Sequence, residues 1–269
     1  MKRPVITLFR RTLLASLLLA AAPGAFAFSI NVNFTGGLTA SQQGAFTQAA
    51  SFWQSVITGY QAGISLTGIT IDASGAAIDG VGGILGQAGP STIVNQGGYV
   101  LADTGTMQFD TADLANMQTN GTLVSVIKHE MAHVLGFGTL WDLNGVYVNG
   151  SGQYTGANAL AAYQKEFVGQ ANAAFVPVEL GGGTGTADGH WNEVDGGAGL
   201  TGIVDHQGRD MRNELMTGWL NSPTFVSNTT RMSFADIGYT VAAVPLPAAI
   251  WLFGSGLGLI ATRKRRQAA

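Results

Sequence analysis

The sequence predicts an α+β domain with a small twisted sheet, one buried helix beside it and a loop-rich C-terminal half. Two segments that alternate apolar and polar residues, Ser29–Phe34 and Ile64–Asp72, predict strands. An apolar run that starts near Leu123 predicts a helix. Glycine supplies 39 of the 269 residues and only 11% of residues are charged, against averages of about 7% and about 25%. This composition favours loops and argues against a helical bundle.

A second helix should follow the first strand. Gly36 and Gly37 end that strand, and Thr39 or Ser41 can cap a helix that runs to about residue 57. Its apolar side chains recur at helical spacing, so they predict a face buried in the core and not a binding site. This face consists of Phe46, Ala49, Ala50, Trp53 and Ile57.

The remaining elements are expected to be short. Residues 74–98 are rich in glycine and predict loops around one short strand, and Thr106–Asp110 predicts another strand. Asp110–Met117 then predicts a short helix or turn. In the second half, Asn158–Val168 predicts a helix, and Ser233–Tyr239 predicts a closing helix that turns into a strand.

The chain contains the pattern His-Glu-x-x-His at His129, Glu130 and His133. Residues four apart lie on one face of a helix, so the two imidazoles can bind one metal ion. The Glu can then reach a water in the open coordination position, as in zinc peptidases. The alternative is a helix whose polar residues have no metal-binding role. Because only 4 histidines occur in the chain, two of them at this spacing favour the metal site.

The third metal ligand must come from further along the chain. Gly136 lets the helix stop and the chain turn, but Thr139 occupies the position where many metzincins place a third His. Three residues remain as candidates. They are His190, His206 and Glu166, the last by analogy with thermolysin-like enzymes, where a Glu on a later helix is the ligand.

Three stretches together resemble the leishmanolysin-type metzincins and their bacterial relatives. They are the run from His129 to Trp141, the Gly-His-Trp at 189–191, and Asn213–Gly218, which reads Asn-Glu-Leu-Met-Thr-Gly. The resemblance spans roughly residues 30–240. It implies a metzincin-like zinc peptidase fold with a long insertion, from Leu140 to Gly189, ahead of the third His.

The resemblance also implies roles for individual residues. The third His of the family is commonly followed by Trp, which favours His190 as the ligand. Met216 would form a Met-turn, an apolar floor beneath the metal. The interval from His190 to Met216 is longer than the family pattern and contains His206, so His206 stays the alternative third ligand.

These residues predict a zinc metalloendopeptidase that acts on a protein or peptide substrate. Zinc would activate a water and polarise the scissile carbonyl, and Glu130 would act as the catalytic general base. The alternative is a non-catalytic extracellular matrix or adhesion protein that retains the metzincin fold. The intact Glu130 favours the enzyme, because a protein without activity has no chemical need for it.

The N-terminal segment is typical of a secretory signal peptide. Basic residues precede an apolar run, Thr12–Ala22, and Ala25-Phe26-Ala27 matches a cleavage site. The alternative is a single-pass membrane anchor. We expect residues 1–27 to be the signal and residues 28–240 to form the metallopeptidase domain.

The C-terminal segment, residues 241–269, resembles the bacterial PEP-CTERM sorting signal. Val244–Pro247 precedes a short apolar run, Ala248–Thr262, and a basic cluster, Arg263–Arg266. The resemblance implies transient membrane anchoring, cleavage by an exosortase-type enzyme, and export to the cell surface or exopolysaccharide matrix of a Gram-negative-type bacterium. The acidic residue of the motif is missing, and a plain membrane anchor is the alternative.

The region between these two ends is strongly acidic. It holds five of the 13 basic residues and all 16 acidic residues, a net charge of −11. This balance argues against nucleic acid as a partner and is compatible with calcium. Either a solvated loop or a structural calcium site would explain the acidic residues that recur in the second half. These are Asp188, Glu193, Asp195, Asp205 and Asp210.

Cysteine is absent from the chain. Disulfide bonds therefore contribute nothing to stability, which must come from core burial and bound metal. A cysteine thiolate on the metal is likewise excluded as a means of inhibition.

Overall fold

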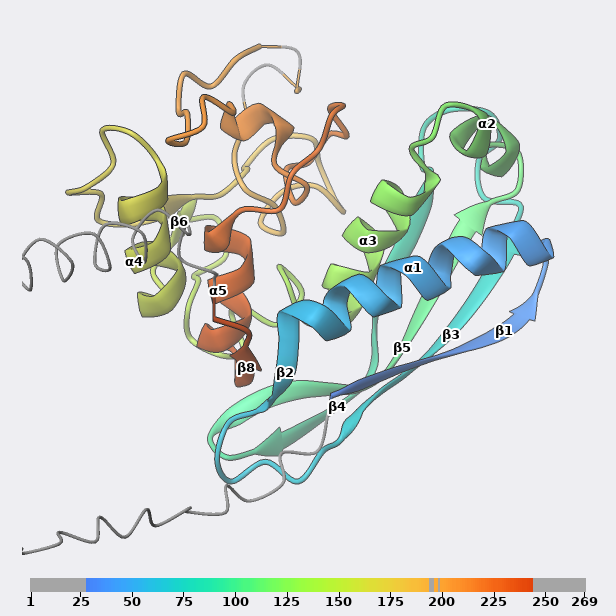
Figure 1. Ribbon diagram of the computed structural model, residues 1–269, viewed down its shortest axis with the longest axis horizontal. Helices are drawn as coiled ribbons and strands as arrows, with labels where there is room; N and C mark the ends of the chain where they lie inside the picture. The colour runs from blue at the N-terminus through green and yellow to red at the C-terminus, as the bar shows by residue number, and fades with distance from the viewer. Residues whose placement is uncertain (1–27, 194–195, 198, 244–269) are drawn as a thin grey trace, which may run out of the picture.

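The computed structural model describes residues 28–193, 196–197 and 199–243 (Figure 1). Its N-terminal half contains a four-stranded sheet in the order β1-β3-β5-β4. Three strands run parallel, and β4 pairs antiparallel with β5 at the edge. The bounds are Ser29–Gly36 for β1, Gly68–Ala76 for β3, Gly86–Gln96 for β4 and Tyr99–Asp110 for β5. The expected α+β class is confirmed.

Two helices pack together on one face of this sheet (Figure 1). They are α1, Ala40–Val56, and α3, Leu123–Val134, and the short α2, Leu114–Thr119, leads from β5 into α3. The apolar face predicted for α1 is buried, with Phe46 and Trp53 at 0% exposure. Helix α1 thereby covers the sheet and packs against α3.

Two polar contacts fix α1 in place. Thr39 is its N-cap, and the Thr39 side chain and the Gln42 side chain each bond the other residue's backbone N–H. Trp53 Nε1 donates a hydrogen bond to the Lys128 carbonyl at 2.9 Å. The second contact ties α1 to the turn of α3 that precedes His129.

The prediction for residues 74–98 was right about a loop, which spans residues 77–85, but wrong about the length of the strand. Instead of a short strand, the chain forms the 11-residue β4, and β5 begins at Tyr99, seven residues before the strand expected at Thr106. Gly97 and Gly98 form the connecting turn, with φ of 60° and 86°, as a two-residue hairpin requires. Pro90 and the glycines of β4 are tolerated because an edge strand is held by backbone hydrogen bonds to one neighbour.

The first half also contains β2, Ile57–Tyr60, which continues directly from α1. The strand predicted from Ile64 begins only at Gly68, where it pairs with Ser29 of β1. Before that, the chain turns, with Ile64 N–H donating to the Gln61 carbonyl at 3.3 Å. Pairing with β1 therefore decides where β3 starts, and alternation alone did not predict it.

The C-terminal half is loop-rich, as expected. Its elements are β6 (Gln153–Tyr154), α4 (Ala157–Glu166), β7 (Val176–Pro177), the 3-10 helix η1 (Met211–Asn213), α5 (Asn228–Asp236) and β8 (Tyr239–Val241). The predicted closing helix and strand are present, and β8 pairs with β2 from the first half. Helices α4 and α5 pack side by side (Figure 1).

This half has little regular secondary structure, and packed aromatic side chains form much of its core. Trp141 and Trp191 stack with ring centroids 5.0 Å apart, and Phe137 meets Trp191 edge-on at 5.1 Å. The Trp191 indole donates to Thr230 Oγ1 at 2.8 Å. Such packing fixes the residue next to Trp191, which is His190.

Within the described residues, no helix combines the length and apolarity that crossing a membrane requires. The predicted signal peptide, residues 1–27, and the motif, apolar run and basic cluster of the C-terminal signal, residues 244–269, lie outside the described residues.

Candidate metal centre

Helix α3 positions the His-Glu-x-x-His residues. Leu123, Ile127 and Met131 are buried against the core at 4%, 0% and 0% exposure, which leaves the face with His129 and His133 toward the second half. The helix ends at Val134, and the chain leaves it through Gly136, whose φ is 106°. The turn expected at this glycine is therefore present.

Three histidine side chains converge at one point. His129 Nε2 lies 3.0 Å from His190 Nε2 and 3.1 Å from His133 Nε2, and the third distance, from His133 to His190, is 3.0 Å. His133 and His190 are buried. The structure thus brings His190 to the pair on α3 across 57 residues of sequence.

Each ring is oriented by a backbone carbonyl on its other nitrogen. His129 Nδ1 donates to Leu215 O at 2.7 Å, His133 Nδ1 to Phe137 O at 2.8 Å and His190 Nδ1 to Thr186 O at 2.8 Å. A carbonyl can only accept, so the proton of each neutral ring sits on Nδ1. All three Nε2 lone pairs therefore face one another with no proton between them.

The electrostatics keep these rings neutral. Burial lowers the pKa of His129, and burial followed by the neighbouring histidines lowers the pKa of His133. Burial, with a contribution from His129, lowers the pKa of His190 to about 3. Neutral imidazole is the form that binds a metal ion.

The donor set fits zinc. Zinc prefers nitrogen ligands in a tetrahedron at about 2.0–2.1 Å, which places ligand nitrogens about 3.3 Å apart, close to the 3.0–3.1 Å separations of the three Nε2 atoms. Three protein ligands leave a fourth position for water, as in catalytic zinc sites. Histidines that bind zinc usually donate their other ring N–H to a carbonyl or carboxylate, as these three Nδ1 atoms do.

Glu130 lies beside this cluster in a cleft of about 640 Å³. The cleft is lined by α3, by the start of β4 at Gly86–Ala88, and by the 184–190 loop. The Glu130 side chain is half-buried, and burial raises the pKa of its carboxyl to about 7. The carboxyl is therefore placed to take up and release a proton inside the cleft.

The Asn213–Gly218 segment passes beside the cluster. The Leu215 carbonyl accepts from His129, and the Met216 carbonyl accepts from Trp191 N–H at 2.9 Å. Met216 itself is fully buried. The segment therefore joins α3 to the strand-like residues that carry His190, and the role of Met216 as a floor beneath the metal stays a prediction.

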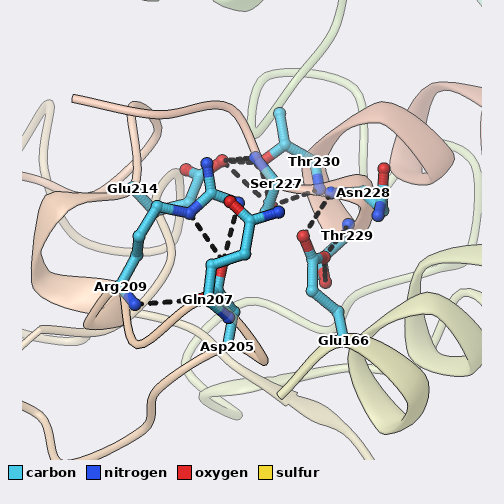
Figure 2. A network of polar contacts seen from close by, with 9 residues as sticks. All are labelled: Glu166, Asp205, Gln207, Arg209, Glu214, Ser227, Asn228, Thr229 and Thr230. Atoms are coloured by element: carbon cyan, nitrogen blue, oxygen red, sulfur yellow. Dashed lines mark hydrogen bonds and ion pairs between the residues drawn. The ribbon is translucent and has the colours of Figure 1, made fainter. Parts of the chain in front are cut away.

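A buried carboxylate, Glu214, holds this turn against α5. It accepts from Met216 N–H at 2.6 Å, from Ser227 N–H and Oγ at 2.9 Å each, and from Thr230 Oγ1 at 2.6 Å. Figure 2 shows it directed at the start of α5. Burial raises the pKa of Glu214, opposed by these donors. The sequence pattern offered no signal for this role.

The two rival third ligands lie elsewhere. His206 is exposed and its Nε2 bonds the Lys165 carbonyl at 3.0 Å. The Glu166 carboxylate accepts from Asn228 N–H at 2.9 Å and Thr229 N–H at 3.0 Å, so it caps α5 (Figure 2). Neither joins the three-histidine cluster.

Sequence reasoning also missed the three carbonyls that orient the rings, at Phe137, Thr186 and Leu215. Every residue except the chain end has a carbonyl, so no residue type marks these positions. Only the folded loops reveal them.

Comparison with known proteins agrees with this geometry. A family model described as Peptidase_M8, leishmanolysin, matches residues 82–258, more than half of the chain. The search of curated proteins found no match to this chain. The matched segment contains the histidine cluster and the Met216 turn. The chain therefore belongs to the leishmanolysin family of zinc metallopeptidases.

Proposed function

We propose that this metallopeptidase is an endopeptidase in which His129, His133 and His190 hold the zinc and Glu130 is the general base. The observation that carries the proposal is the set of three unprotonated Nε2 atoms 3.0–3.1 Å apart. When bound, zinc supplies Lewis-acid activation of water and of the scissile carbonyl.

Glu130 performs the proton transfers. Its carboxylate takes a proton from the attacking water and returns it to the leaving amine. Burial raises the pKa of this carboxyl to about 7, and a raised pKa makes a carboxylate a stronger base. The carbonyls on the three Nδ1 atoms keep the rings in one orientation throughout.

The shape of the cleft supports internal cleavage of a chain. Residues Gly86–Ala88 of the edge strand β4 line it, and β4 pairs with a strand on one side only within the described residues. An extended peptide can add to such an edge through backbone hydrogen bonds. This mode of binding places no requirement on a free peptide terminus.

A test of this function combines metal content with cleavage of an unstructured protein such as casein. The purified protein should hold one zinc per chain and cleave internal bonds. Removal of zinc by a chelator should abolish cleavage, and added zinc should restore it. A folded, zinc-loaded protein that cleaves nothing would instead favour the matrix or adhesion protein that retains the fold.

We also propose that the chain is exported and anchored transiently through its C-terminal segment before an exosortase-type enzyme removes that segment. The site residues all lie between His129 and Met216, which supports a separable tail. Deletion of Val244–Ala269 should yield soluble protein with the parent's zinc content and activity, whereas the full chain should partition with membranes. An insoluble, zinc-free truncated protein would show that the tail belongs to the fold.

A further inference from the structure

The loop Thr186–His190 carries both the third histidine and the group that orients it. His190 Nδ1 donates to the Thr186 carbonyl at 2.8 Å, so the loop closes on itself. The ring and the carbonyl can meet only if the residues between them turn the chain back. The shape of this loop therefore decides whether His190 faces His129 and His133.

Asp188 lies in the middle of this loop and in the lining of the cleft. Its φ is 65°, and among the described residues no other non-glycine residue has a positive φ. This left-handed conformation is unfavourable for residues with a side chain, although Asp and Asn tolerate it better than most. Such a conformation persists where surrounding contacts enforce it, and it is concentrated at functional sites.

Three hydrogen bonds hold Asp188 in this conformation. Its N–H donates to the Glu179 carbonyl at 2.8 Å, and its Oδ1 accepts from Gly150 N–H at 2.8 Å and from the Tyr147 hydroxyl. Tyr147 is buried and meets Trp141 edge-on with ring centroids 6.0 Å apart. Burial, followed by the bond to Asp188, raises the pKa of Tyr147, so the phenol keeps the proton that it donates. Asp188 is thereby tied to the aromatic cluster.

The next residue of the loop, Gly189, packs against the turn that ends α3. Gly138 has a φ of 73°, and an added Cβ at this position would overlap the Gly189 backbone. Gly138 directly follows Phe137, whose carbonyl orients His133. The bonds of Asp188 thus hold the loop where its backbone touches α3's last turn, and this contact brings His190 beside the two histidines of the helix.

Asp188 is one of the acidic residues for which the sequence allowed a structural calcium site. Asp205 and Asp210 accept hydrogen bonds from neighbouring residues, and Asp195 lies outside the described residues. Within the described residues, three acidic side chains nowhere come close enough to share one ion. The calcium site stays a prediction, and the contacts of Asp188 indicate a different role.

We propose that Asp188 is a positioning residue for zinc binding, and that its carboxylate, held by Tyr147 and Gly150, sets the loop in which Thr186 orients His190. The proposal rests on the proposed function, because it takes His190 as a zinc ligand. The Asp188 carboxylate bonds loop residues and none of the three histidine rings. It contributes a loop that is already in the shape required for the metal.

Zinc affinity, measured by competition with a chelator, tests this role. Asp188→Gly removes the carboxylate but suits the left-handed backbone, and its zinc affinity should fall by about 10-fold or more. Asp188→Asn keeps an oxygen acceptor at the same place and tolerates the same conformation, so it should bind zinc like the parent. Parent-like affinity in Asp188→Gly would overturn the proposal. Equal losses in the two variants would overturn it as well, because they would assign the effect to the charge.

Asp142→Gly is the matched control. It makes the same change at an exposed acidic residue of the same insertion that lies outside the cleft lining. Its zinc affinity should equal that of the parent. A loss as large as that of Asp188→Gly would show that any acidic residue of the insertion has this effect, which contradicts a specific role for Asp188.

Tyr147→Phe tests the contact from its other side with a milder change. The ring can still pack against Trp141, but the hydroxyl donor is gone. Zinc affinity should fall, and by less than in Asp188→Gly, because Gly150 N–H still bonds the carboxylate. The double variant should bind zinc like Asp188→Gly alone, since both changes remove one shared contact. Losses that simply add would show that the two residues act independently, against the proposal.

Ring nitrogen NMR spectra of the zinc-free protein separate this inference from the zinc site itself. In the parent, His190 should be one tautomer with its proton on Nδ1. Asp188→Gly should show both tautomers at His190, while His129 and His133 keep theirs. A merely structural role would lower the Tm without this change. A parent that binds no zinc would refute the proposed function, yet the tautomer change would still uphold the positioning. An unchanged His190 tautomer in Asp188→Gly would refute the positioning alone.

Discussion

Glu130→Gln should lower kcat by about 10²–10⁴-fold while the protein keeps one zinc per chain. The change removes the group that accepts the proton from water but keeps the size and shape of the side chain. Burial raises the pKa of Glu130 to about 7, and its carboxylate takes part in no hydrogen bond with the described residues. Loss of the charge therefore breaks no structural contact.

The fold should tolerate this substitution well. Burial disfavours the charged form of this carboxylate, so a neutral amide should leave the Tm unchanged or raise it slightly. Glu130→Ala should lose activity to the same extent. The parallel measurements are kcat on a peptide substrate, zinc per chain and Tm.

Glu166→Gln provides the matched control. It makes the same chemical change at a residue that caps α5 and lies outside the cleft lining. The control should lose some stability but keep the parent's kcat per folded molecule. Hydrolysis by Glu130→Gln at the parent rate would exclude Glu130 as the general base.

The α3 half of this site was predictable because its geometry is local. Any helix places His129 and His133 on one face, and the apolar run around them predicted both the helix and its burial. The structure has α3 at Leu123–Val134 with the two rings 4.8 Å apart between centroids. No long-range contact was needed for this inference.

The β4–β5 hairpin was missed for a physical reason. Its stability comes from backbone hydrogen bonds along the ladder, and β4 has little of the alternation that marks a half-buried strand. The Gly97-Gly98 pair was the available signal, since two glycines between extended segments predict a tight hairpin. This omission matters because β4 lines the cleft.

The third ligand depends on contacts that span the second half. Spacing to Met216 favoured His206, whereas the following Trp favoured His190. In the structure, residues 204–210 turn back on themselves, with Val204 paired to Asp210, and His206 lies at the tip of this turn. Trp191 is instead packed within the aromatic cluster, and this packing holds His190 at the metal site.

His190→Ala should therefore abolish zinc binding, whereas His206→Ala should keep one zinc per chain. Two histidines bind zinc far more weakly than three. The zinc affinity of His190→Ala should therefore fall by more than the 10- to 100-fold that follows the loss of a hydrogen bond to a metal ligand. His206 bonds only the Lys165 carbonyl, at 3.0 Å, among the described residues, and its exposure predicts a stability change within about 0.5 kcal/mol.

Zinc per chain after dialysis, together with the Tm, measures both effects. The Tm of His190→Ala should match that of zinc-free parent protein, since the two share the fold and lack the metal. That comparison separates a lost ligand from an unfolded chain, because a collapsed fold would give a Tm well below the zinc-free parent. Full zinc in His190→Ala with loss in His206→Ala would reverse the assignment. Full zinc in both variants would favour Glu166 as the third ligand. That outcome would contradict the structure, in which the Glu166 carboxylate bonds the start of α5.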